Sequence, residues 1–278
     1  MDETGNRLLP WFLWAQLVPG IMLGRWIGWA AFGTMAVLVA ATALIGRRGT
    51  AATEWLGLTQ PPPGWWSVTW ALTLPTVVWP RWLALPFSLV LPDVAAPSYT
   101  GSGVGFALMA VLVVPLMEEM LYRGLLLTAL RSHGRWPAIT VSALLFGLGH
   151  GPTTAFSTFL VGWVLAWLAW EYRSIWPGVI IHTAFNLFAA LGALAFESGP
   201  GSLAEPVAAV GMLLVTGAAL VITGRRRATI RRVFGGPWLE PDQGVSTGRE
   251  ILRILGRWPV AAVGLISLAG ILLDLSSS

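Results

Sequence analysis

Three ionisable residues interrupt the apolar segment PLMEEMLYRG, residues 115–124. Glu119 and Arg123 are four residues apart, so on a helix they share a face and form an ion pair. Glu118 is turned about 100° away from Glu119 by the helical repeat, which leaves its carboxylate available as a general base. Tyr122, four residues after Glu118, is placed to donate a hydrogen bond to it. The alternative for these charges is a polar clasp between helices that has no chemistry.

Two further apolar stretches each contain a histidine. In ALLFGLGHG, Phe146 and His150 are four residues apart, and in GVIIHTAFNLF, His182 and Asn186 have the same spacing. Either histidine alone is explained by a hydrogen bond to a neighbouring helix. Together with Glu118 they supply one carboxylate, two imidazoles and one carboxamide. These are the groups that activate a water molecule and stabilise an oxyanion.

These three motifs, taken in order, resemble those of a known protein family. EExxxR begins at Glu118, FxxxH at Phe146 and HxxxN at His182. The set is similar to the CAAX protease and bacteriocin-processing family of intramembrane endopeptidases, which includes the type II CAAX prenyl endopeptidases. The resemblance covers about residues 102–196, and the N-terminal spans and the last span lie outside it.

The resemblance implies a role for each matched residue. In the family pattern Glu118 is the catalytic base, and His150 helps to hold or polarise the attacking water. His182 and Asn186 complete the site by binding the developing oxyanion. The residues expected to support these groups are Glu119, Arg123, Tyr122 and Phe146. The implied reaction is hydrolysis of a peptide bond in a membrane-associated polypeptide, for protein maturation, C-terminal processing or sorting.

The same residues leave the use of a metal open. Glu118, His150 and His182 form a two-histidine, one-carboxylate set that suits a divalent ion such as zinc. His182 would then be a ligand instead of an oxyanion donor. The HExxH motif is missing and no carboxylate is evident behind either histidine. We therefore expect either no cofactor or a zinc-like ion, with the metal-independent mechanism favoured.

Other classes of protein fit the sequence less well. The chain has no cysteine, so a cysteine nucleophile and a cysteine-ligated metal are excluded. The GxSG and GxGD motifs of other intramembrane proteases do not occur. The main rival is a proton-coupled membrane transporter that uses the glutamates and histidines as a relay. A non-catalytic membrane scaffold is the third interpretation.

Composition predicts the elements that position these groups. Of 278 residues, 55% are hydrophobic and 11% are charged, which is more apolar surface than one soluble core can bury. We predict an all-α, polytopic transmembrane bundle of about eight or nine spans, with the catalytic core on its central helices. The candidate spans are 8–24, 27–45, 67–91, 102–131, 136–151, 155–172, 176–196, 206–223 and 258–275.

Two features complicate this arrangement. Pro75, Pro80 and Pro86 predict that the span 67–91 is kinked or broken. His182 lies nearer than Glu118 to the cytoplasmic end of its span, and the two depths differ by roughly 10 Å at a rise of about 1.5 Å per residue. Helix tilt could bring the two residues level.

The spans divide the chain into three regions: residues 1–101, with N-terminal spans and a connecting loop; 102–196, the catalytic core; and 197–278, with C-terminal spans, a basic cytoplasmic segment and an interfacial helix. In the last region Arg249, Arg253 and Arg257 recur every four residues beside apolar neighbours. This pattern predicts a short helix on the cytoplasmic membrane surface, with its arginines toward lipid phosphates. A solvated connector is the alternative.

The placement of the basic residues sets the expected location and partners. All 17 are arginine, and they lie singly or in short loops between apolar spans, so nucleic acid is not expected as a partner. With the N-terminus inside, most arginines face the cytoplasm and only Arg25 faces the opposite side. We expect an integral protein of a prokaryotic cytoplasmic membrane, with the lipid bilayer and a polypeptide substrate as partners. The sequence does not specify an oligomeric state.

Overall fold

The computed structural model describes the chain in blocks, and every regular element in them is a helix. The described residues are Pro10, Phe12, 52–88, 108–150, 152, 154–197, 204–228 and 247–277. Within these blocks the predicted all-α fold class is confirmed. The predicted spans 8–24 and 27–45 lie outside them apart from Pro10 and Phe12, so the number of spans remains a prediction.

The helices follow one another with short connections. In chain order they are α3 (Ala52–Trp55), α4 (Trp65–Ser88), the π-helical η1 (Met109–Val113), α6 (Val114–Glu119), the π-helical η2 (Met120–Leu126), α7 (Leu127–Leu130), the 3-10 turn η3 (Arg131–His133), α8 (Arg135–Leu148), α9 (Ala155–Tyr172), α10 (Trp176–Glu197), α11 (Ala204–Arg225), α13 (Thr247–Leu255) and α14 (Trp258–Ser277). The helices predicted at 155–172, 176–196, 206–223 and 258–275 are thus confirmed to within a few residues.

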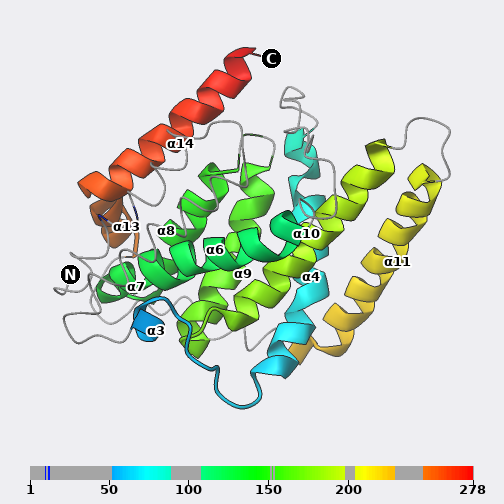
Figure 1. Cartoon of the computed structure of the whole chain (residues 1–278), viewed down its shortest axis with the longest axis horizontal. Helices are drawn as coiled ribbons and strands as arrows, with labels where there is room; N and C mark the ends of the chain where they lie inside the picture. Colours follow the sequence, from blue (N-terminus) through cyan, green and yellow to red (C-terminus); the bar gives the residue numbers. More distant parts are fainter. Residues whose placement is uncertain are drawn as a thin grey trace.

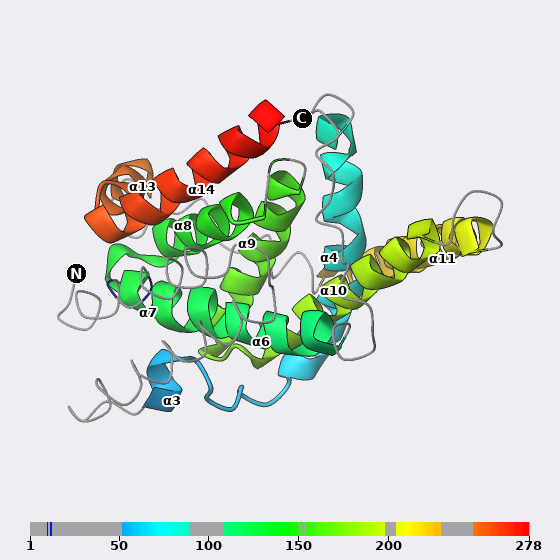
Figure 2. The ribbon, with the colours of Figure 1, turned by 45° about the horizontal axis from the view of Figure 1, so that its top comes forward.

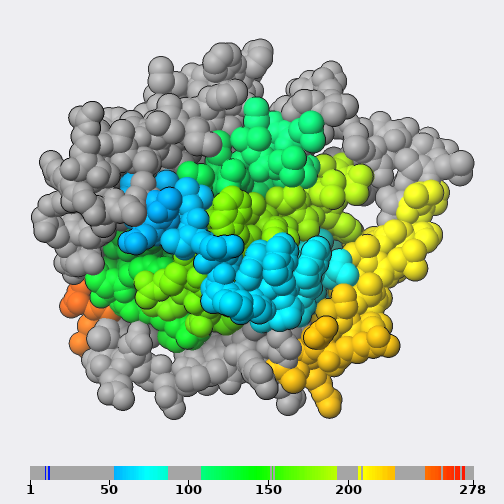
Figure 3. All heavy atoms as spheres, turned by 60° about the horizontal axis from the view of Figure 1, so that its bottom comes forward, coloured from blue at the N-terminus to red at the C-terminus, as the bar shows by residue number. Residues whose placement is uncertain are grey.

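The helices form a bundle around α6 and η2 (Figure 1). α8 and α9 pack against each other and against η2, while α10 packs on α4, α9 and α6. α11 lies at one edge against α4 and α10, and Figure 3 shows it in yellow and orange beside cyan α4. α13 and α14 lie at the other edge, against α8 (Figure 2). The fully buried side chains of the core include Leu125, Leu126, Leu130, Ile139 and Leu165.

The helix predicted for 102–131 is described from residue 108 and contains two π-helical segments. η1 and η2 flank the short helix α6, and the run continues through α7 into η3. π-Helical turns are rare in proteins and are frequent at functional sites. Glu118 and Glu119 are the last residues of α6, and Arg123 lies in η2. The candidate acidic residues therefore lie where the helical repeat is irregular.

α4 is one continuous helical element, although Pro75, Pro80 and Pro86 lie inside it. The span is therefore not broken at these prolines. A proline removes one backbone hydrogen bond, and helices tolerate this where neighbouring groups compensate. Arg81 donates to the carbonyl oxygens of Val77 and Phe185, which supplements the bonding of α4 and ties it to α10.

In the part of the chain that the structure describes, no single helix is both long enough and apolar enough to cross a bilayer. Two consecutive segments, Gly248–Leu255 and Pro259–Ala269, reach the required length and apolarity when taken together, with a bend of 83° between them.

α13 is attached to the end of the η3 turn by a buried histidine–glutamate pair. His133 donates from Nδ1 to Oε2 of Glu250 over 2.9 Å, and both side chains are buried. Arg253 pairs with the same carboxylate. The hydrogen bond from His133 holds the pKa of Glu250 below its ordinary value. Local spacing does not indicate this pair, because Glu250 lies 117 positions after His133.

The Glu250 carboxylate makes the attachment of α13 sensitive to acid. Because its pKa is lowered in the folded state, the stabilisation is present above the ordinary value of 4.5 and is lost as pH falls through the lowered pKa. We expect the amides of α13 to exchange faster below pH 4.5, relative to those of α9. In Glu250→Gln, α13 should exchange faster already at neutral pH and show no further acid response. An equal acid response in both proteins would contradict the prediction.

Candidate active site

Glu119 lies fully buried beside Arg123. Its Oε1 is 3.0 Å from Nη1 of Arg123, so the predicted i,i+4 ion pair is confirmed. Arg123 is also buried, and it donates from Nη2 to the Gly162 carbonyl over 3.1 Å. Its guanidinium lies over the Phe146 ring, 4.2 Å from the centroid. Both charges need such partners, because a buried charge that loses its partner costs about 3–5 kcal/mol.

The same oxygen of Glu119 orients His182 on α10. Nδ1 of His182 is 3.0 Å from Oε1 of Glu119, and an ionised carboxylate only accepts hydrogen bonds, so Nδ1 carries the proton. Nε2 points to the neighbouring glutamate and lies 3.4 Å from Oε2 of Glu118. The Glu118 side chain is 26% exposed, whereas that of Glu119 is inaccessible. The two adjacent glutamates therefore have different surroundings, and only Glu118 can meet a substrate.

His150 approaches the other oxygen of Glu118. Its Nε2 is 3.9 Å from Oε1 of Glu118, while its Nδ1 is 2.7 Å from the Phe146 carbonyl oxygen. A carbonyl only accepts hydrogen bonds, so Nδ1 carries the proton and Nε2 of the neutral imidazole presents a lone pair. A separation of 3.9 Å is too long for a direct hydrogen bond. Glu118 thus faces the Nε2 atoms of two histidines.

The position of His150 differs from the prediction. The predicted span 136–151 includes His150, but α8 ends at Leu148 and His150 lies in the turn that follows. The segment GLGHGP is rich in glycine and ends in proline, a composition that terminates helices. The last carbonyls of a helix lack hydrogen-bond partners within the helix. Nδ1 of His150 donates a hydrogen bond to one of them, the carbonyl oxygen of Phe146. The spacing of these two residues therefore reflects a cap at the end of α8.

The ring of Phe146 joins the parts of the site. Its centroid lies 4.5 Å from the ring of His150 and 5.5 Å from that of His182. Tyr122 packs edge-on against it at 5.1 Å. The Tyr122 hydroxyl lies near Gly149, where an added Cβ would be 3.3 Å from it. Phe146 and Tyr122 therefore pack around the charged groups, and the hydrogen bond predicted for Tyr122 stays a prediction.

Asn186 lies one helical turn beyond His182 on α10. Its Nδ2 donates to the carbonyl oxygen of Ala110 in η1 over 2.9 Å. This bond ties α10 to the helical run that carries the glutamates. The side-chain amide has a second hydrogen, and the predicted role of Asn186 in binding an oxyanion stays a prediction.

Glu118, His150 and His182 have oriented imidazole rings, as metal ligands do, but their side chains are not spaced as in a metal site. In the part of the chain that the structure describes, no group of three or more His, Cys, Asp or Glu side chains has the arrangement of a metal site. Both imidazoles nevertheless donate their second nitrogen to a carboxylate or a carbonyl, as metal ligands do. The expectation that no carboxylate backs either histidine is wrong, because Glu119 backs His182. The residues that would hold an ion are still Glu118, His150 and His182.

Comparison with protein families gives one match, which covers the segment described above. Residues 100–188 match the model described as type II CAAX prenyl endopeptidase Rce1-like. This segment is therefore similar to the CAAX protease family. The predicted resemblance is confirmed over residues 102–188. Comparisons with curated proteins and with solved structures give no significant match.

The matched segment, residues 100–188, contains all the predicted site residues. It runs from before η1 into α10, so it includes Glu118, His150, His182 and Asn186. α4, α11, α13 and α14 lie outside it. The match supports peptidase activity at the level of the family, and the roles of the individual residues stay predictions.

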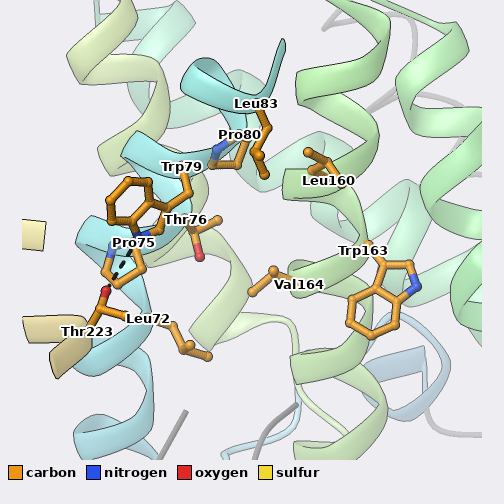
Figure 4. Close-up of a pocket in the computed structure, with 10 residues that line it drawn as sticks. All are labelled: Leu72, Pro75, Thr76, Trp79, Pro80, Leu83, Leu160, Trp163, Val164 and Thr223. Atoms are coloured by element: carbon orange, nitrogen blue, oxygen red, sulfur yellow. Dashed lines mark hydrogen bonds between the residues drawn. The ribbon is translucent and has the colours of Figure 1, made fainter. Parts of the chain in front are cut away.

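A separate apolar cavity lies between α4, α9 and α11 (Figure 4). Its volume is about 240 Å³. The side chains around it include Leu72, Pro75, Leu83, Leu160 and Val164. Trp79 donates from Nε1 to the Thr223 hydroxyl across one wall over 3.3 Å. None of the predicted site residues lines the cavity, so it is distinct from the cluster of Glu118, His150 and His182.

Gly178 on α10 makes room for the buried carboxylate. A Cβ atom at this position would lie 2.6 Å from Oε2 of Glu119. Gly178→Ala must displace that carboxylate, and we expect it to lower the stability by about 1–3 kcal/mol, measured as thermal unfolding of the purified protein. Gly192→Ala on the same helix is the control, because a Cβ there meets no atom within 4 Å. Equal losses in the two variants would show that the space beside Glu119 does not matter.

Proposed function

We propose that this chain is an intramembrane endopeptidase that hydrolyses a peptide bond with a water molecule activated by Glu118. The observation that carries the proposal is that two histidine Nε2 atoms lie beside this carboxylate. Nε2 of His182 is 3.4 Å from Oε2 of Glu118, and Nε2 of His150 is 3.9 Å from Oε1. Nδ1 of each imidazole is held, by Glu119 and by the Phe146 carbonyl respectively. An accessible carboxylate beside oriented imidazoles is the arrangement that general-base catalysis requires.

In the proposed reaction Glu118 acts first as a base and then as an acid, and His182 and Asn186 bind the oxyanion. Glu118 takes a proton from a water molecule between its carboxylate and His150, and the resulting hydroxide attacks the substrate carbonyl carbon. The carbonyl oxygen becomes an oxyanion, which accepts hydrogen bonds from Nε2 of protonated His182 and from Asn186. Glu118 then gives its proton to the leaving amine as the C–N bond breaks. Glu119 accepts the hydrogen bond from Nδ1 of His182 throughout and so keeps the ring oriented.

The proposal includes a membrane location, with about eight or nine spans and a cytoplasmic N-terminus in a prokaryotic cytoplasmic membrane. Exposed apolar side chains on the outer helices support it. Leu213 and Leu214 on α11 are 67% and 69% exposed, and Leu265 on α14 is 67% exposed. Large apolar patches of this kind mark surfaces that contact a membrane or another protein.

The proposed substrate is a membrane-associated polypeptide, cleaved for maturation, C-terminal processing or sorting. The family match at residues 100–188 supports peptide hydrolysis over a proton relay built from the same groups. A relay would move protons without cleaving any bond. The two functions therefore differ in whether membrane polypeptides change length.

Glu118→Gln should abolish processing, with a loss of at least about 100-fold, because the amide cannot accept a proton. The measurement compares the membrane polypeptides of cells that express each variant at equal level. Glu171→Gln is the control, since it removes a partly exposed carboxylate paired with Arg135 on the α8–α9 surface. If Glu118→Gln processes the same polypeptides as the unmodified chain, the endopeptidase proposal fails and the transporter and scaffold functions remain.

Metal analysis of the purified protein separates the two versions of the mechanism. Without a metal, we expect substoichiometric zinc and unchanged processing after treatment with a chelator. If a metal takes part, it is held by Glu118, His150 and His182, and polarises the water or the substrate carbonyl. One zinc per chain that disappears in His182→Ala would contradict the metal-independent mechanism and leave the endopeptidase function intact.

A further inference from the structure

The outer face of α13 contains two arginines and one apolar residue. Leu252 and Arg253 follow Arg249 by three and four residues, so all three lie within an arc of about 100° on this nine-residue helix. Leu252 is 72% exposed, the Arg253 side chain is 63% exposed and Arg249 is exposed. Arg257, predicted to continue the row, is only partly exposed. The exposed face therefore contains two arginines with one leucine at its edge.

The only acidic residue of α13 points away from this face. Glu250 is buried and accepts the hydrogen bond from Nδ1 of His133. Its negative charge is therefore directed into the protein, although Arg253 reaches it with one nitrogen. A helix with a basic polar face and an exposed leucine has the composition of helices that lie in the headgroup region of a membrane.

The orientation of α13 relative to α14 fits this location. The two segments Gly248–Leu255 and Pro259–Ala269 meet at 83°. α14 is apolar, and its exposed residues include Leu265, Leu268 and Leu272. If α14 runs along the membrane normal, α13 lies nearly parallel to the membrane surface. Its arginines are then level with lipid phosphates.

We propose that α13 binds anionic phospholipid at the membrane surface. Arg249 and Arg253 donate to phosphate oxygens, and Leu252 inserts at the boundary between headgroups and acyl chains. The His133–Glu250 pair attaches this helix to η3, at the end of the run that carries Glu118. The lipid site lies outside residues 100–188; it rests on the proposed membrane location but not on the proposed peptidase activity.

The chain has no cysteine, so a single label reports on α13 in the full-length protein. Gly248→Cys is a suitable position, because an added Cβ there meets no atom within 4 Å and the lipid-facing residues are kept. The label is an environment-sensitive fluorophore, and the protein is placed in nanodiscs of phosphatidylcholine with increasing phosphatidylglycerol. We expect the emission to shift to shorter wavelength as phosphatidylglycerol is added, and the shift to weaken at high salt.

Arg249→Gln with Arg253→Gln, in the labelled background, should require about tenfold more phosphatidylglycerol for the same shift. The matched control removes two exposed arginines after α11, by Arg226→Gln with Arg227→Gln, and should leave the titration unchanged. Inorganic phosphate added to phosphatidylcholine nanodiscs should cause no shift. The proposal is overturned if phosphatidylcholine alone or inorganic phosphate gives the full shift, or if both double variants titrate alike.

Discussion

The buried carboxylate of Glu119 is the constraint on which the arrangement of the helices around the candidate site depends. A carboxylate without partners is not stable in the interior, so the surrounding elements must supply both charge and space. Arg123 supplies the charge from η2, and His182 supplies a hydrogen bond from α10. Gly178 and Gly162 leave the volume that Glu119 and Arg123 occupy. The position of α6 relative to η2, α9 and α10 follows from these contacts.

The same constraint separates the functions of the two adjacent glutamates. Because Glu119 is paired with Arg123 and accepts from His182, it holds a proton on Nδ1 of His182 and directs Nε2 away from itself. Glu118, one residue earlier, is left partly exposed and faces the remaining nitrogen. The second imidazole, His150, follows the end of α8 and is oriented by its hydrogen bond to the carbonyl oxygen of Phe146 in the last turn of that helix. A site with two oriented histidines is thus assembled from one buried ion pair and one helix end.

A second buried histidine–glutamate pair connects the edge of the molecule to the same helical run. His133 and Glu250 join η3 to α13, outside the segment that matches the CAAX protease family. In both pairs the carboxylate accepts from Nδ1 of the histidine. The inner pair orients His182, and the outer pair holds α13 with its arginines outward. The core and the α13 edge therefore use one kind of interaction to position different elements.

The sequence by itself determined what depends on neighbours within a few residues. The Glu119–Arg123 pair follows from i,i+4 spacing, and the bounds of α9 and α10 follow from apolar length. Other contacts join residues far apart in the chain, such as His133 and Glu250, which are 117 positions apart. The predicted spans put His182 and Glu118 at membrane depths that differ by roughly 10 Å. Only the tertiary structure decided that His182 lies 3.4 Å from Glu118, because helix tilt and packing leave no trace in local hydropathy.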